Sequence, residues 1–192
     1  MTAKGLPEPG AGEAAVEVRR VGPGGSMAPD NAFAVALLTL WHRVVRAGGA
    51  VGFLPSVDRA ELGDPVSRVI ADLRSGRAYG YALTRQRDVV GFVMLESGTG
   101  VSAHTGTVGL VMVEPNSQAG GLGATLMKSI LELAAASGLE RVRLFVAADQ
   151  RLERFFQQFG FAESGRSPDW IRTERTPDVD QVLMSATIQP PS

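Results

Sequence analysis

The spacing of apolar residues changes several times along the chain, and each change marks a different element. Spacings of three and four residues are typical of amphipathic helices, whereas alternation is typical of strands. Helical spacing begins after Asp30, after Asp64-Pro65, over residues 121–137 and after Asp149, and the three aspartates can cap helices. Alternating or continuously apolar runs predict strands over residues 16–21, 79–84, 89–96, 107–114, 141–146, 161–165 and 181–188.

The predicted elements follow the order strand, helix, helix, three strands, helix, strand, helix and two strands. The connections at residues 85–88 and 97–106 are short enough for antiparallel hairpins. Strands mixed with helices in this order predict an α/β (mixed α+β) fold. Residues 1–13 are rich in turn-forming residues and predict a disordered tail, which leaves residues 14–190 as one domain. Residues 167–180 predict a polar loop that carries Asp169 and Trp170.

Composition excludes several classes of protein. The 192 residues include no cysteine and two histidines, which rules out disulfides, thiolate metal sites and a cysteine nucleophile, and predicts no metal site. The net charge of −1 gives no basic field for nucleic acid or an anionic membrane. The longest apolar stretch, Ala32 to Trp41, is about half as long as a membrane span. With no secretory signal at the N-terminus, the sequence predicts a soluble cytoplasmic protein.

The segment from Val108 to Thr125 carries the one motif with chemical content. A strand ends at Glu114-Pro115, and a helix begins around Gln118-x-x-Gly121-x-Gly123. The first N–H groups of a helix have no partner within the helix and attract anions, and glycines let the backbone approach a phosphate. The lysine of a Walker A loop is missing, as are the third glycine and the acidic residue of a Rossmann fingerprint. Two interpretations remain: a pyrophosphate cradle of the acetyl-coenzyme A type, or a tight turn between strand and helix.

The wider context of this motif is more specific. Val113, Pro115, Gln118, Gly121 and Gly123 form the string V-x-P-x-x-Q-x-x-G-x-G, followed by an amphipathic helix and an apolar strand. This string resembles motif A of the GNAT superfamily of N-acetyltransferases. The downstream string from Asp149 to Phe161 is similar to motif B of that superfamily, and the order of elements matches too. The resemblance implies a GNAT fold: a mixed, mostly antiparallel sheet of about seven strands, splayed at the cofactor site and flanked by about four helices.

The resemblance also implies a co-substrate, acetyl-CoA, and no metal. Backbone groups of Met112 and Val113 would then hydrogen-bond the pantetheine arm in a gap between the strands 107–114 and 141–146. The pyrophosphate would lie on backbone amides, with the Thr125 hydroxyl added; these amides belong to Gln118, Ala119, Gly120, Gly121, Leu122, Gly123 and Ala124. Asp149, Phe155 and Phe156 fall where the superfamily lines the distal part of the CoA channel.

A second, narrower resemblance concerns the acceptor. The loop from Arg46 to Pro55 (RAGGAVGFLP) is similar to a loop that walls the acceptor pocket in tabtoxin-resistance-type acetyltransferases. The resemblance implies that Phe53 contacts the acceptor; the alternative is a loop whose apolar side chains fill the core. In GNAT folds the loop between the last strands lies beside the acceptor, which makes Trp170 a candidate lid. Tyr81 is a further candidate contact, with packing in the sheet as its alternative.

The chain departs from the superfamily at two positions that handle protons. Many GNAT enzymes carry a glutamate near the start of the motif A strand as general base, where this chain has Thr107. Many carry a tyrosine in motif B as general acid, where this chain has Phe156. His104, Glu96 and Glu114 are the candidate substitute bases, and the alternative for each is an exposed surface residue.

We therefore expect an acetyl-CoA-dependent N-acetyltransferase that acts on a primary amine of a small molecule. Direct transfer in a ternary complex is expected, because no cysteine is present to form an acetyl-enzyme. One alternative, favoured by Thr107 and Phe156, is a catalytically weak or inactive acyl-CoA-binding protein. Another is an enzyme that acetylates protein or peptide amines, for which a wide acceptor groove would be the sign. GNAT proteins often pair, so the resemblance extends the expectation of a homodimer to this chain.

Overall fold

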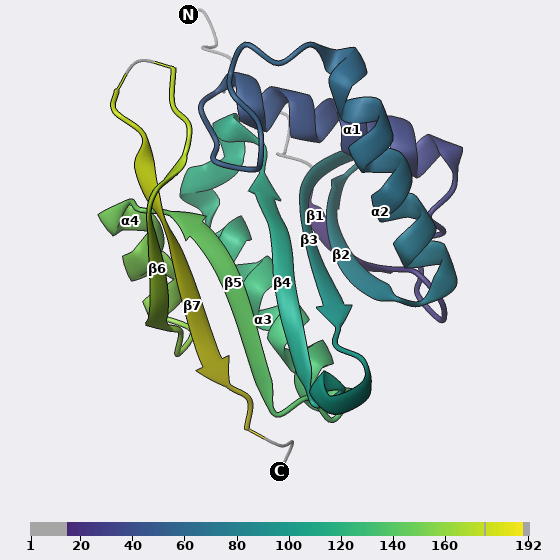
Figure 1. Cartoon of the computed structure of the whole chain (residues 1–192). Helices are drawn as coiled ribbons and strands as arrows, with labels where there is room; N and C mark the ends of the chain where they lie inside the picture. Colours follow the sequence, from purple (N-terminus) through teal and green to yellow (C-terminus); the bar gives the residue numbers. More distant parts are fainter. Residues whose placement is uncertain (1–14, 175, 190–192) are drawn as a thin grey trace, which may run out of the picture.

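A seven-stranded sheet forms the centre of the molecule, and helices cover parts of both faces (Figure 1). This computed structural model describes residues 15–174 and 176–189, except the side chains of Gln118 and Ala119. The elements in chain order are β1 (Val16–Val21), α1 (Asn31–Arg46), η1 (Arg59–Leu62), α2 (Gly63–Ser75), β2 (Ala78–Arg85), β3 (Asp88–Ser97), η2 (Gly100–Ser102), β4 (Thr105–Val113), η3 (Pro115–Gly120), α3 (Leu122–Ala136), β5 (Arg141–Ala147), α4 (Gln150–Gln157), β6 (Ala162–Ile171) and β7 (Val179–Thr187).

The strands follow the order β1-β2-β3-β4-β5-β7-β6 across the sheet. Neighbouring strands are antiparallel except for β4 and β5, which are parallel. The chain reaches β5 from β4 through α3, as a parallel connection requires. The predicted mixed, mostly antiparallel sheet with four helices is therefore confirmed.

Each face of the sheet has its own apolar core. On one face, α1 and α2 cover the strands β1 to β3, and Leu37 is fully buried between them. On the other face, α3 and α4 cover the sheet, with Leu126 fully buried. The central strand β3 serves both cores, because Phe92 faces the first and its neighbour Val93 the second. Beyond β4, no described helix covers the first face, which leaves β5, β7 and β6 open on that side (Figure 1).

Two of the three predicted aspartate caps are confirmed. The Asp30 carboxylate accepts a hydrogen bond from the Phe33 amide at 2.9 Å, and Asp149 caps α4. The prediction that Asp64 caps the second helix is wrong. The preceding residues already form the turn η1, which Asp58 caps, and α2 continues directly from it at Gly63. Asp64 therefore lies in the first turn of α2, where a carboxylate still favours the helix dipole.

The predicted polar loop at residues 167–180 is shorter than expected. Strand β6 continues to Ile171, so Trp170 belongs to a strand and not to a loop. The pairing with β7 is irregular between Ser167 and Ile171, and Asp169 has a φ of 50°. This irregularity explains the wrong boundary, because Pro168 and Asp169 interrupt the alternation that would identify a strand. Trp170 is 69% exposed.

Two expectations concern the termini and membranes. The predicted tail over residues 1–13 lies outside the described residues. Among the helices that the structure describes, none has the length and apolar character needed to cross a membrane.

A cluster of charges joins α4 to the last two strands. Arg166 on β6 lies 2.7 Å from Glu163, 3.2 Å from Asp180 on β7 and 3.8 Å from Glu153 on α4. The hydrogen bond from Arg166 holds the pKa of Glu163 below its ordinary value of 4.5. A lowered carboxyl pKa contributes stability above the ordinary value and loses it as the pH falls through the folded value.

We predict that Arg166→Ala lowers the melting temperature at pH 7 by a few degrees at most, because the pairs are exposed. The difference from the wild type should shrink as the pH falls below 4.5. Thermal unfolding followed by circular dichroism between pH 3 and 7 measures this. Arg141→Ala, which removes an exposed arginine of β5, is the control. A deficit that stays constant across this range would contradict the assigned pairing.

Candidate active site

The site is built where β4 and β5 separate. These parallel strands pair only at three positions, from Thr105 opposite Arg141 to Thr107 opposite Arg143. Beyond Thr107, β4 has no partner residue on β5, while β5 stays paired with β7 up to Ala147. The sheet is therefore split in its middle, over the second half of β4. The predicted gap between these two strands is thus a feature of the fold.

A bulge in β4 lies beside this gap. Phe92 of β3 pairs with Met112 and Met94 pairs with Gly109, so β4 has one residue more than β3 over this stretch. Within the bulge, Leu110 has a φ of 52°. A left-handed conformation costs a non-glycine residue roughly 1–2 kcal/mol. Bulges re-aim the backbone of a strand, and strain of this kind is concentrated at functional sites.

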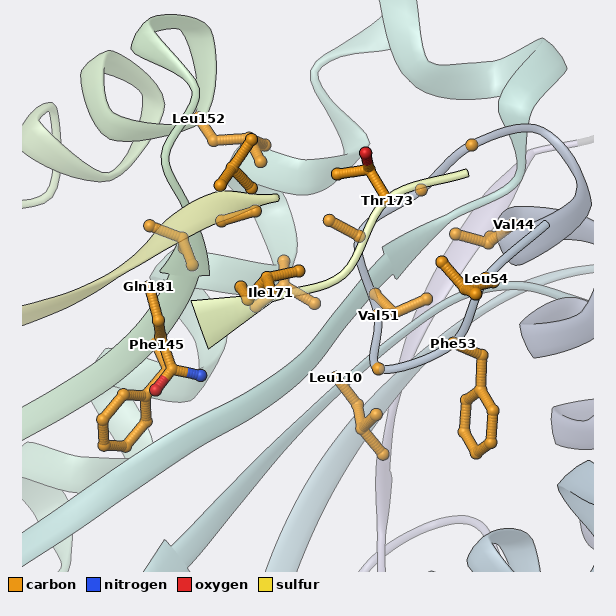
Figure 2. A pocket seen from close by; sticks show the side chains of 18 of the residues that line it. Val44, Val51, Phe53, Leu54, Leu110, Phe145, Leu152, Ile171, Thr173 and Gln181 are labelled. Atoms are coloured by element: carbon orange, nitrogen blue, oxygen red, sulfur yellow. The ribbon is translucent and has the colours of Figure 1, made fainter. Parts of the chain in front are cut away.

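A cavity of 1110 Å³ occupies the gap. Its strand half is lined by β4 residues 108–111 and 113, by β5 residues 144–147 and by Leu152 and Phe156 of α4. Its loop half is lined by residues 46–55, after and at the end of α1, and by residues 170–174, at the end of β6. Figure 2 shows the segment with Ile171 and Thr173 next to the loop with Val51 and Leu54, near Leu110 on β4.

The start of α3 lies directly after β4, where the motif predicts an anion cradle. The turn η3 ends at Gly120, and Gly121 has a φ of 72°, a conformation that favours glycine. A Cβ atom at Gly121 would meet no atom within 4 Å, so the space beside this turn is open. The Thr125 hydroxyl donates to the Gly121 carbonyl at 3.4 Å.

Gly123 lies at a close contact between α3 and α4. A Cβ atom there would lie 3.3 Å from Cζ of Phe155 and 3.9 Å from Val113. The missing side chain therefore lets α4 pack against the first turn of α3. Phe155 in turn contacts Phe156, with ring centroids 5.0 Å apart. These contacts fix the side of the cavity that α4 forms.

The loop after α1 is held by aromatic packing. The Trp41 indole N–H donates to the Val51 carbonyl at 2.9 Å. The Phe53 ring lies against Trp41, with centroids 5.9 Å apart, and Figure 2 shows this ring turned away from Ile171. Phe53 thus lines the cavity and also packs against the core.

A hydrogen bond connects the two segments that line the loop half of the cavity. The Ser56 amide, in the loop before α2, donates to the Glu174 carboxylate at 2.8 Å. The two residues are 118 positions apart in the sequence. The link joins the loop that follows α1 to the turn between β6 and β7, and Trp170 lines the cavity beside it.

The three candidate bases do not line the cavity. His104 is exposed and precedes β4, and its carbonyl accepts from the Glu140 amide at 2.8 Å, at the end where β4 and β5 pair. Glu96 is exposed and lies opposite Thr107 at that same end. Glu114 follows β4 at the other end and pairs with Arg43 at 3.4 Å. Thr107 itself accepts a hydrogen bond from Arg143 at 3.2 Å.

The remaining candidates are distributed unevenly. Phe156, Val113, Phe53 and Trp170 line the cavity, whereas Tyr81 lies on β2 in the core on the α3 face. The Asp149 carboxylate accepts from the Arg151 amide at 2.7 Å. Within the described residues, no group of three or more potential metal ligands was found. Sequence reasoning missed the cavity residues of β5, the bulge at Leu110 and the link from Ser56 to Glu174, none of which has a local sequence signal.

Comparison with known proteins places the chain in a family. The model of the acetyltransferase (GNAT) family matches residues 53–161, which is more than half of the chain. The chain therefore belongs to the GNAT family of acetyltransferases. The comparison with curated protein sequences gave no match.

Solved structures show the same fold at low sequence identity. A GNAT acetyltransferase from Streptococcus pneumoniae has a TM-score of 0.71 at 19% identity, over 91% of this chain and 100% of that one. The ribosomal-protein-S18-alanine N-acetyltransferase of Escherichia coli has a TM-score of 0.68 at 15% identity, over 93% and 97%. YncA of Salmonella typhimurium, solved with its cofactor acetyl-CoA, has a TM-score of 0.71 at 16% identity, over 93% and 97%.

We predict that Glu174→Ala opens the loop half of the cavity. The Ser56 amide would lose its acceptor, so its hydrogen exchange should speed up by about fivefold, the equivalent of one ordinary hydrogen bond. Glu174→Gln keeps an acceptor oxygen and is the matched control. Hydrogen exchange followed by NMR measures the effect, and unchanged protection of Ser56 in the alanine variant would contradict the link.

Proposed function

We propose that this protein transfers the acetyl group of acetyl-CoA to the primary amine of a small molecule, in one direct step within a ternary complex. The cavity is the observation that carries the proposal. It joins a strand half, open between β4 and β5, to a loop half that the Ser56–Glu174 link spans. A thioester arm and an amine that must meet it need two such adjoining compartments.

The strand half and the start of α3 fit acetyl-CoA. A pantetheine arm carries amides that can hydrogen-bond to a strand. The β4 backbone beyond Thr107 can offer such an edge, because it does not pair with β5 there. Hydrogen bonds at Met112 and Val113 would then align the arm along β4. The open turn at Gly121 and the amide-rich start of α3 suit a pyrophosphate. In this proposal the backbone amides of residues 118–124 hold the pyrophosphate, while Asp149, Phe155 and Phe156 border the distal channel.

The chemical step needs a polarised carbonyl. The amine nitrogen attacks the thioester carbon, a C–N bond forms, the C–S bond breaks and CoA leaves as a thiolate. Negative charge develops on the carbonyl oxygen, and a fixed backbone N–H is the ordinary group that stabilises it. We assign this donor to the bulge around Leu110, whose backbone lies beside the cavity at a φ that is unfavourable for a non-glycine residue.

Among the described residues of the cavity wall there is no histidine and one carboxylate, Glu174, to receive the proton of the attacking amine. One oxygen of that carboxylate accepts from the Ser56 amide. Phe156 lines the cavity where a tyrosine would have supplied a proton. The acceptor must therefore arrive as a free amine, and its proton passes to water. Any contribution from His104, Glu96 or Glu114 requires intervening water.

A protein acceptor is the second candidate. Its support is the likeness to the Escherichia coli ribosomal-protein-S18-alanine N-acetyltransferase, which is a likeness of fold at 15% identity. The Ser56–Glu174 link argues against it, because a polypeptide chain needs an open groove across these two loops. This link across the loop half therefore favours a small amine.

We predict that Gly121→Glu weakens acetyl-CoA binding by about 10²-fold or more, because it fills the cradle and adds a like charge. Gly138→Glu is the matched control: Gly138 follows α3, has a φ of 73°, and a Cβ atom there would likewise meet no atom within 4 Å. Both variants carry the same backbone strain and the same charge. Calorimetry that finds equal affinities in the two variants would refute the cradle.

We predict that kcat/KM rises with pH up to the pKa of the acceptor's own amine, because the described lining residues include no histidine and their one carboxylate, Glu174, is held by the Ser56 amide. Glu96→Gln, His104→Ala and Glu114→Gln should each cost less than the roughly 10²-fold expected for a general base. Phe156→Tyr should raise kcat if departure of the thiolate limits the rate. A plateau near pH 7 that one of these variants abolishes would identify that residue as the base. Tight acetyl-CoA binding without transfer to any amine would favour the inactive alternative.

A further inference from the structure

Three charged residues, all exposed, line the loop half of the cavity. They are Arg46, Arg172 and Glu174, and they come from the two segments that face each other there. Their neighbours are apolar, including Trp41, Val44, Val51, Leu54 and Ile171. Charge recognition of an acceptor thus depends on very few groups.

Two of these charges are already engaged. The Arg172 guanidinium donates to the Asp178 carboxylate at 2.9 Å. The Glu174 carboxylate accepts from the Ser56 amide at 2.8 Å. Both groups therefore take part in contacts that shape the turn between β6 and β7.

Arg46 differs from both. It donates to the Pro55 carbonyl at 3.2 Å, across the loop that lines the cavity. In the part of the chain that the structure describes, its guanidinium forms no ion pair. A guanidinium has five N–H donors, so one contact with a carbonyl leaves most of them available. The net charge available to a ligand in this half is therefore positive.

We propose that the acceptor carries an acid group, such as a carboxylate, in addition to its amine and an apolar body, and that Arg46 binds the acid group. This inference rests on the proposed function. A carboxylate matches the planar guanidinium in shape and charge. The apolar wall would hold the body of the acceptor, and the amine would point to the gap between β4 and β5.

The same charge balance disfavours polycationic acceptors. A second ammonium group in the loop half would meet two arginines, Arg46 and Arg172, and a single carboxylate, Glu174, among the described lining residues. Polyamines and aminoglycosides are therefore poor acceptors under this proposal.

A purely structural role for Arg46 makes different predictions. Arg46 is the last residue of α1, where a cation favours the helix dipole. A variant that lost only this effect would melt earlier but would treat all acceptors alike. Selectivity among acceptors is therefore the informative measurement.

The test compares three acceptors that share one aminomethylbenzene core: benzylamine, 4-(aminomethyl)benzoate and p-xylylenediamine. We expect the wild type to prefer the benzoate over benzylamine by about tenfold in kcat/KM, as a charge-assisted hydrogen bond allows. The diamine should be the poorest of the three. Arg46→Gln should remove the preference by raising KM for the benzoate alone, and Arg46→Lys should restore part of it.

Arg59→Gln is the control, because Arg59 belongs to the connection between α1 and α2 but does not line the cavity. Equal use of the three acceptors by the wild type would overturn this inference and leave the proposed function standing. An Arg46→Gln variant that loses activity equally with all three would also overturn it. No acetylation of any of the three, with acetyl-CoA bound, would overturn the assignment of a small-amine acceptor and this inference with it.

Discussion

The separation of β4 from β5 is the constraint on which the rest of the structure depends. After three paired positions the strands part, and the β4 backbone loses its neighbour on one side. Backbone polar groups at a strand edge require hydrogen-bond partners, so a gap of this kind suits a ligand that brings its own amides. The bulge at Leu110, the start of α3 and the packing of Phe155 against Gly123 all border that gap.

The opposite half of the cavity depends on contacts between distant parts of the chain. Trp41 anchors the loop after α1, and the Ser56 amide reaches Glu174 beyond β6. The open face of β5, β7 and β6 makes room for this arrangement, because α1 and α2 cover the other strands of that face (Figure 1). The fold therefore determines the gap between β4 and β5. The two loops determine which acceptor can approach a thioester bound in that gap.

The order of elements was predictable from the sequence because it rests on local signals. The change from helical to alternating spacing at residue 79 and the glycines around residue 121 each act over a few positions. The cavity was less predictable, because it depends on which residues of neighbouring strands lie opposite each other and on where that pairing ends. Residues 104 and 110 are close in sequence but roughly 20 Å apart along an extended strand, so His104 and the bulge lie toward opposite ends of β4. A leucine in a left-handed conformation, as at Leu110, gives no sequence signal.

A crystal structure of the protein with acetyl-CoA would test the central claim most directly. The account predicts the pantetheine arm between β4 and β5, the pyrophosphate on the turn at residues 118–124, and the thioester carbonyl beside the backbone of Leu110. Acetyl-CoA bound elsewhere, with the gap between β4 and β5 filled by side chains, would contradict it.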